Sequence, residues 1–400
     1  MKLEVFKYKI RKKIYEFLDN TVIHHFQKLF FKPIRSDILI FDDFFPCPLS
    51  NFRYIEFNEY LKNYNTLVFT TGKSLKYVHL FDSIRKFIKI HPERNRIRLF
   101  WKDIPIEGKL AILVFQHNAV NFLDFLENNK IPFIFTLYPG GNFRLYNNQG
   151  DKELKKIFQS IYFRKVIVTQ KITKQYLIEN KLCKSENIEF IYGCPVEINQ
   201  NDNFKVKQSR ELINICFVAA KYHPTGMDKG YDIFIDVAKL LCKSSTKFRF
   251  HIVGGFNEFD IDTNEIRDYV CYYGYLDMDE LKKFYENMDF ILSPNRSNIL
   301  SSGAFDGFPT ASVVEAGLKG VIMMFTDDFN QNIYFQNNID CIFVDHNAYN
   351  IYKKIIEISG NTELMHTLSV NGQNLLLNLF SYENQIIKRF EIIDTLIKEK

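Results

Sequence analysis

The chain has 400 residues, of which 46% are hydrophobic and 25% charged, values that are ordinary for a soluble globular protein. Its length indicates roughly two to three domains. The seven cysteines are scattered, without a C-x-x-C pair, a pattern untypical of a disulfide framework or a zinc site. The charged N-terminus is unlike a signal peptide, and no apolar run approaches the ~20 residues of a membrane helix. We therefore expect a cytoplasmic protein.

The net charge of +5 is concentrated near the N-terminus. Between Met1 and Arg35 there are nine basic residues against three acidic ones, with apolar residues interleaved at nearly helical spacing. Such a segment fits a solvated helix that packs one face on the domain. It also fits a basic amphipathic element on an anionic membrane surface, which would place the protein at the inner face of the membrane. No motif that stacks on bases or reads a groove accompanies the charge, so we expect no nucleic-acid partner.

Short β-rich runs alternate with helical patterns over the first half of the chain. The patterns predict helices at Leu75–Ile90, Ala119–Asn128 and Thr173–Asn180. The predicted buried strands are Asp37–Phe41, Thr66–Thr70, Leu110–Phe115, Phe133–Leu137, Lys165–Thr169 and Ile188–Tyr192. This alternation predicts a parallel sheet with both faces covered.

A polar stretch from Glu197 to Arg210 has the composition of a linker, and the alternation restarts beyond it. The second half is predicted to contain the strands Ile213–Ala219, Phe248–Val253, Val270–Tyr273, Phe290–Ser293, Val321–Phe325 and Cys341–Val344, and the helices Gly230–Lys243, Met278–Asn287 and one from Ala311. We expect a basic segment (1–35), an N-terminal domain (36–196), a hinge (197–212), a C-terminal domain (213–375) and a last helix that could return to the N-terminal domain (376–400). Two such domains would bind a ligand between the carboxyl ends of their strands.

Several common ligand motifs are missing from this framework. The strand Ile213–Ala219 is not followed by the G-x-G-x-x-G of dinucleotide-binding folds. Thr70–Ser74 ends like a phosphate-binding P-loop, but Leu67 occupies the place of the first glycine. No H-E-x-x-H or H-x-H pair indicates a metal, and no G-x-S-x-G indicates a hydrolase nucleophile. We expect neither a bound metal nor a cofactor.

The C-terminal half carries an ordered set of residues suited to a diphosphate. Lys221 follows the first strand, and Lys229 precedes the next helix, so both can supply positive charge. The turn Asp306-Gly307-Phe308-Pro309-Thr310 lets backbone N–H groups approach a phosphate, and Thr310 can cap the following helix. Glu315, about one turn inside that helix, can accept both hydroxyls of a ribose.

These features resemble the donor half of family 4 retaining glycosyltransferases, which have the GT-B fold of two Rossmann-like α/β domains facing each other across a cleft. The resemblance is specific over about Asn214–Phe325 and covers the first domain only in architecture. It rests on Lys221, Lys229-Gly230, Gly254-Gly255, Gly274, Met288–Pro294, Asp306–Thr310 and Glu315-Ala316-Gly317.

The resemblance implies a role for each matched position. Lys221, where the family usually has Arg, and Lys229 would bind the diphosphate. Glu315 matches the second acid of the family's Glu-x7-Glu motif and would hold the ribose. Asp306 replaces the first Glu, which contacts the transferred sugar; its side chain is shorter and its spacing to Glu315 one residue longer. The remaining donor-side positions are Gly254, Gly307, Phe308, Pro309, Thr310, and Tyr275 and Leu276, where the base would pack.

The acceptor side departs further from the family pattern. Tyr138 stands roughly where the family has a catalytic-domain His, so its hydroxyl is expected to contact the sugar. The Gly140-Gly141 turn beside it either lines the cleft or simply ends a strand. His117, at another strand end, is the alternative polar group. Ser50 and Arg53 could face the cleft at a helix start or serve only structure.

We therefore expect a retaining glycosyltransferase that moves a sugar from a nucleoside diphosphate sugar, most simply a UDP-sugar, to a glycan or lipid-linked glycan in surface polysaccharide biosynthesis. Two alternatives remain open at this stage. One is a non-catalytic sugar-nucleotide or glycan-binding subunit, and the other is a GT-B sugar-nucleotide epimerase.

Overall fold

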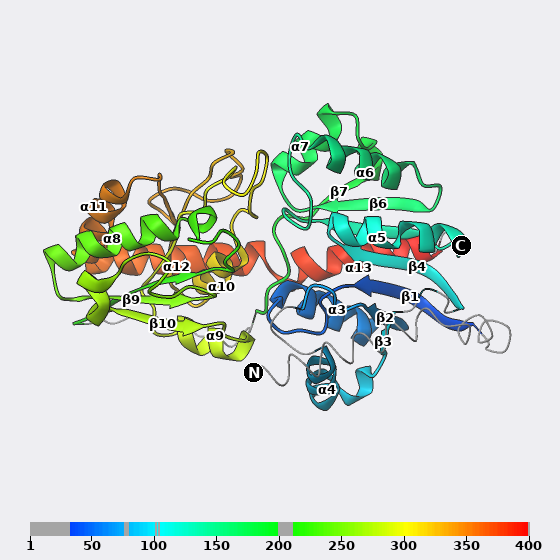
Figure 1. Ribbon diagram of the computed structural model, residues 1–400, viewed down its shortest axis with the longest axis horizontal. Coiled ribbons are helices and arrows are strands. Elements are labelled where there is room, and N and C mark those ends of the chain that lie inside the picture. The colour runs from blue at the N-terminus through cyan, green and yellow to red at the C-terminus, as the bar shows by residue number, and fades with distance from the viewer. Residues whose placement is uncertain (1–32, 76–79, 101, 103–104, 199–210, 399–400) are drawn as a thin grey trace.

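The computed structural model describes residues 33–75, 80–100, 102, 105–198 and 211–398 (Figure 1). The basic N-terminal segment lies outside these residues up to position 32, and most of the expected hinge, 199–210, lies outside them as well. Among the described residues, no helix is both long enough and apolar enough to cross a bilayer.

The N-terminal domain is built on a parallel sheet, which has seven strands in the described part of the chain, in the order β3-β2-β1-β4-β5-β6-β7. The strands are β1 (Ile34–Asp42), β2 (Thr66–Thr70), β3 (Ile97–Leu99), β4 (Ile106–Val114), β5 (Phe133–Leu137), β6 (Phe163–Val168) and β7 (Ile188–Phe190). Alternate residues of a strand point to opposite faces, so each strand serves two cores. Leu39 and Phe41 of β1 face one core and Ile38 and Ile40 face the other.

Helices cover both faces of this sheet. One core is closed by α5 (Gln116–Asn128), α6 (Asn148–Gln159) and α7 (Lys171–Glu179). The other is closed by α3 (Asn51–Asn63), α4 (Leu80–Ile90) and the C-terminal helix α13 (Lys388–Lys398). The buried, apolar strands follow from this double cover.

The C-terminal domain repeats the plan with a parallel sheet in the order β10-β9-β8-β11-β12-β13. Its strands are β8 (Ile213–Val218), β9 (Phe248–Val253), β10 (Val270–Gly274), β11 (Phe290–Ser293), β12 (Ile322–Phe325) and β13 (Ile342–Phe343). Its helices are α8 (Tyr231–Ser244), α9 (Met278–Tyr285), α10 (Ala311–Leu318), α11 (Ala348–Ser359) and α12 (Thr362–Leu379). Two parallel sheets with helices on both faces confirm the predicted α/β class.

The C-terminal helices join the two domains. In Figure 1, α12 runs along the C-terminal domain and α13 continues into the N-terminal domain, where the chain ends. Ile393 of α13 is fully buried against the β1 residues of the second core. Arg389 is also fully buried, and its Nε lies 3.6 Å from Glu56 Oε1 of α3. The last helix is thus part of the N-terminal domain's core.

Each apolar strand predicted from the sequence is present, with ends shifted by at most a few residues. Helix α6 and the short edge strand β3 were not predicted, and of α3 only the start near Ser50 was expected. In α3 the buried side chains include Arg53 and Glu56, so its inner face lacks the apolar periodicity that marks a helix.

Candidate active site

Lys229 and Asp306 form an ion pair at the carboxyl edge of the C-terminal sheet. Lys229 follows β8 in a tight turn, and its Nζ lies 2.6 Å from each carboxylate oxygen of Asp306. The lysine is only 5% exposed, and its Nζ lies 4.9 Å from the centre of the Tyr222 ring. Burial alone would lower the pKa of Lys229, but Asp306, assisted by Tyr222 and Asp228, raises it above its ordinary value. The site therefore holds a buried positive charge.

Lys221, the second expected cation, lies in the loop after β8 and forms an ion pair with a carboxylate other than Asp306. Its Nζ donates to Asp260, in the loop after β9, and both side chains are largely buried. Asp260 also accepts the backbone N–H of Asn257, which fixes that loop. Each of the two lysines thus has its own carboxylate partner.

Two glycines are required by the close approach of neighbouring backbone. Gly254 has a φ of 125°, and a Cβ there would lie 2.0 Å from the Ala219 carbonyl oxygen. Gly230 has a φ of 70°, and a Cβ there would lie 2.1 Å from the Pro294 carbonyl oxygen. Both positions hold strand-end loops of the C-terminal sheet together, which is the physical reason for the glycines noted in the sequence.

The turn from Gly307 to Thr310 differs from its expected role in two details. The Phe308 N–H is already used, because it donates to Gln170 Oε1 of the N-terminal domain at 3.0 Å. The Phe308 ring is buried, and Pro309 has no N–H to offer. Thr310 occupies the N-cap position of α10 but does not cap it, since its hydroxyl lies 3.1 Å from Ser312 Oγ instead. The expectation that the Thr310 side chain caps this helix was wrong.

Glu315 of α10 points across the domain interface. Its Oε1 accepts a hydrogen bond of 2.7 Å from Asn51 Nδ2, at the start of α3 in the N-terminal domain. The carboxylate lines a small cavity of about 40 Å³ between α3, α9 and α10, together with Lys282 and Tyr285. Burial raises the pKa of Glu315 to about 7, although the Asn51 hydrogen bond and the charge of Lys282 act in the opposite direction.

The segment expected to receive the base ends β10. Gly274 has a φ of 69°, and Tyr275 beyond it is 40% exposed. Leu276 packs partly buried against the core between α9, α10 and α12. If Gly255 carried a Cβ, that atom would lie 2.9 Å from the Tyr275 hydroxyl oxygen. This segment therefore packs directly against the loop after β9.

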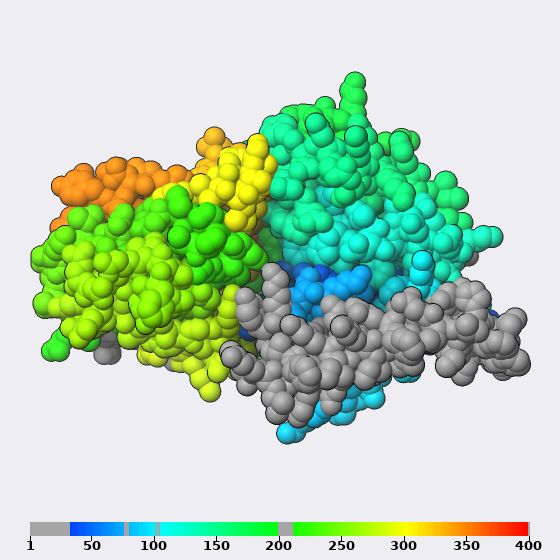
Figure 2. Space-filling view, viewed as in Figure 1, coloured from blue at the N-terminus to red at the C-terminus, as the bar shows by residue number. Residues whose placement is uncertain are grey.

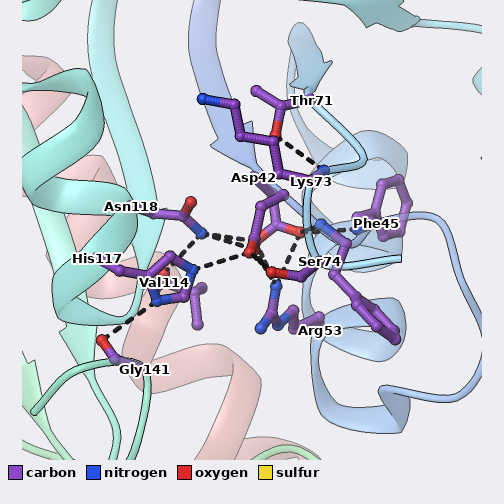
Figure 3. Close-up of polar contacts among 12 residues, drawn as sticks. Asp42, Phe45, Arg53, Thr71, Lys73, Ser74, Val114, His117, Asn118 and Gly141 are labelled. Carbon is purple, nitrogen blue, oxygen red and sulfur yellow. Dashed lines mark hydrogen bonds and ion pairs between the residues drawn. The ribbon is translucent and has the colours of Figure 1, made fainter. Parts of the chain in front are cut away.

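A cluster of polar side chains lies at the facing edge of the N-terminal sheet (Figure 3). Asp43 is its centre: Oδ1 accepts from Arg53 at 2.7 Å and from Asn118 at 3.1 Å. Its Oδ2 lies 2.9 Å from His117 Nε2 and accepts the Ser74 hydroxyl. Burial alone would raise the pKa of Asp43, but the His117 hydrogen bond and the charge of Arg53 hold it well below its usual range.

Asp42 completes this cluster from the last position of β1. Its carboxylate accepts the backbone N–H groups of Phe44 and Phe45 at 2.8 and 2.7 Å, and also binds Arg53. The buried contacts of the two aspartates fix the loop between β1 and α3.

Of the remaining acceptor-side candidates, some lie in this cluster or beside it and others do not. His117 lies in the cluster, and its Nδ1 lies 3.2 Å from the Gly141 carbonyl oxygen. Gly140 and Gly141 have φ values of 81° and 54° and form the turn after β5. Ser50 sits at the N-cap position of α3 without a capping hydrogen bond from its side chain.

Tyr138 is placed away from these residues. It is 6% exposed and packs in the core beside Phe52 and Phe115. Its hydroxyl accepts from Arg389 Nη2 at 3.4 Å, on the α13 side of the sheet. This position does not support the expected contact between Tyr138 and a sugar.

The raised pKa of Glu315 predicts a pH-dependent stability difference. Between its ordinary value of 4.5 and the folded value of about 7, the folded protein retains a proton that the unfolded chain releases. The stability contributed by Glu315 is therefore complete below the lower value and is lost as pH rises through the upper one, by up to about 3 kcal/mol. Urea unfolding of the wild type and of Glu315→Gln from pH 5 to 8 measures it. The wild type should lose stability relative to the variant, and parallel curves would contradict the assignment.

Comparisons with known proteins identify a family model and several similar proteins. Residues 200–375 match the family model of glycosyl transferases group 1. The chain is similar to an uncharacterized glycosyltransferase of Methanocaldococcus jannaschii, with 26% identity over 324 residues that cover 78% of this chain and 82% of that protein.

Two solved structures share the two-domain fold. HepE of Anabaena, in complex with UDP-glucose, matches with a TM-score of 0.66 at 13% identity, covering 91% of this chain and 100% of that one. WaaG, a glycosyltransferase involved in lipopolysaccharide biosynthesis, matches with a TM-score of 0.57 at 12% identity, covering 89% and 99%.

The two parallel sheets, with charged side chains at their facing edges, and these matches define the protein as a glycosyltransferase of the GT-B fold. The segment that matches the family model contains Lys221, Lys229, Asp306 and Glu315.

Proposed function

We propose that this glycosyltransferase takes a sugar from a UDP-sugar and transfers it to a glycan or lipid-linked glycan with retention of anomeric configuration. The observation that carries the proposal is the buried cation of Lys229, bound to Asp306 within the segment that matches the family model. The pair places a cation at the carboxyl edge of an open parallel sheet, where such folds bind their ligands, and a diphosphate is the anionic part of such a donor.

Lys229 and Lys221 stabilise the departing diphosphate in this proposal. Negative charge develops on the leaving group as the bond to the sugar breaks, so preorganised cations lower the barrier. The N-terminus of α10, which begins at Ala311, adds a favourable dipole. The lysines thereby supply the positive charge without a metal ion. Because each lysine has a carboxylate partner, a diphosphate would compete with Asp306 and Asp260 for them.

Glu315 binds the ribose in this proposal. A carboxylate can accept hydrogen bonds from both hydroxyls of a ribose. Asn51 donates to Glu315 Oε1, which is one of the two oxygens that the hydroxyls would contact. Binding of the nucleotide therefore displaces Asn51 from Glu315. The complex of HepE with UDP-glucose supports the choice of uridine and of a hexose.

The N-terminal domain binds the acceptor in this proposal. The cluster around Asp43 and His117 and the Gly140–Gly141 turn provide polar groups at the sheet edge that faces the donor domain. The similarity to WaaG supports a surface polysaccharide as the product. The basic segment before β1 would rest on an anionic membrane that carries a lipid-linked acceptor.

The test is nucleotide release from a panel of UDP-, GDP- and ADP-sugars, with and without glycan acceptors. We expect UDP release that depends on a glycan acceptor and is unchanged by EDTA, with the α-configured donor giving an α-linked product. An inverted product would contradict the retaining mechanism. Loss of activity on chelation would contradict the role of the lysines, and no release from any donor would overturn the function.

A further inference from the structure

A loop of the donor domain, residues Asn298–Phe308, is seated on the N-terminal domain; we call it the docking loop. In Figure 2 its yellow surface abuts the green surface of the N-terminal domain. Leu145 N donates to the Gly303 carbonyl at 2.9 Å, and Arg144 donates to Ser301 Oγ at 2.7 Å. A Cβ on Gly303 would lie 1.8 Å from the Leu145 carbonyl oxygen, so the two backbones are in direct contact.

Two anchors hold the docking loop on either side of Asp306. Before it, Phe305 is 7% exposed and belongs to the core of the N-terminal domain, with its ring 6.0 Å from that of Phe143. After it, the Phe308 N–H donates to Gln170 Oε1. Gln170 follows β6 and is 2% exposed, so its side chain has little freedom to move.

The ion-pair partner of Asp306 lies in another loop of the same C-terminal domain. Lys229 follows β8 and takes its position from the C-terminal sheet. The backbone on either side of Asp306 is held from both domains. The Phe308 ring packs on Phe325 in the C-terminal core, and Asn295 of the same domain donates to Asp306 Oδ2. The N-terminal domain adds the contact of Phe305 and the hydrogen bond from Phe308 N–H to Gln170 beside the 2.6 Å pair between Lys229 and Asp306.

We infer that Gln170 is a positioning residue for the sugar-side carboxylate: it places Asp306 against Lys229 from the opposite domain. The inference rests on the proposed donor site for its catalytic consequence, although the geometric statement stands without it. The bond from Phe308 N–H to Gln170 fixes the backbone two residues after Asp306, so its loss should misplace the carboxylate relative to Lys229.

The kinetic test is a double-mutant cycle with Gln170→Met and Asp306→Asn. Methionine keeps the length of glutamine but removes the oxygen that accepts the Phe308 N–H. We expect kcat to fall roughly five- to tenfold in Gln170→Met, as for loss of one hydrogen bond, with the Kd for UDP unchanged. If Gln170 acts through Asp306, the double variant should be no slower than Asp306→Asn alone. Independent, multiplying losses would overturn the inference.

Two further measurements separate this inference from the proposed function. Gln149→Met, on the exposed face of α6, is the matched control and should leave kcat unchanged. A crystal structure of Gln170→Met without ligand needs no substrate, and we expect Asp306 to be displaced from Lys229 in it. An intact pair in that structure would refute the positioning role. A wild type that turns over no nucleotide sugar, with Asp306 displaced in the variant, would refute only the proposed function.

Discussion

Replacing Lys229 with alanine is expected to lower the transfer rate by roughly 10²–10³-fold, the usual cost of removing one preorganised charge or donor at a developing anion. The side chain is buried beside Asp306, so water cannot replace the ammonium group with the same orientation. Removing it also leaves Asp306 facing the donor phosphates without a counter-charge. Steady-state rates of UDP release with a saturating glycan acceptor measure the effect.

Lys243→Ala is the matched control, because this lysine lies in the same domain on α8 with its side chain 70% exposed. It should retain the wild-type rate. Thermal unfolding of both variants distinguishes loss of activity from loss of folding. We expect Lys229→Ala to fold, because the Asp306 side chain that loses its partner is 31% exposed and can be solvated. A folded Lys229→Ala variant with wild-type turnover would show that the diphosphate binds elsewhere.

Replacing Arg389 with methionine is expected to destabilise the protein by about 3–5 kcal/mol, the usual cost of breaking a buried ion pair. Arg389 and Glu56 are both fully buried, and Arg389 also donates to the Gln385 carbonyl at 2.6 Å. Burial raises the pKa of Glu56 while Arg389 opposes that rise, so the variant would leave an unpaired buried carboxyl. Urea unfolding at neutral pH measures the loss.

The double variant Glu56→Gln with Arg389→Met provides the control, because it removes both charges from the same core. It should recover much of the stability lost in the single variant. If the double variant is less stable than Arg389→Met alone, the ion pair is not the cause, and the packing of α13 would explain the loss.

The fold could be predicted where burial leaves a local pattern in the sequence. Strands such as Leu110–Phe115 are apolar along their whole length because helices cover both faces of the sheet. Helix α3 could not be predicted in the same way, since Arg53 and Glu56 occupy its inner face and satisfy charges that come from β1 and α13. Those partners are distant in sequence, so no local periodicity reveals them.

The residues of the candidate site also fall into those that the sequence predicts and those that it does not. Lys229, Asp306 and Glu315 all lie in one domain, and their residue types and order along the chain could be read from the sequence. The ion pair between Lys229 and Asp306 was not predicted, because the two residues are 77 positions apart. Gln170 and Asn51 were missed because each contacts the site only across the domain interface. A polar residue shortly after a buried strand, as Gln170 is two positions after β6, was the one local signal.

Tyr138 shows the converse error. Its position after β5 matches the place of a catalytic side chain in the family, but position along a strand does not determine which way a side chain points. The buried Arg389 of α13 draws its hydroxyl to the other face of the sheet. That partner lies 251 positions away in the chain, beyond the reach of any local pattern.

The most direct test of the donor site is a crystal structure of the full chain with UDP. Our account predicts the diphosphate between Lys221 and Lys229, the ribose hydroxyls on Glu315, and Asn51 displaced from that carboxylate. A nucleotide bound away from Lys229, or a Glu315 still bonded to Asn51 with UDP present, would contradict it.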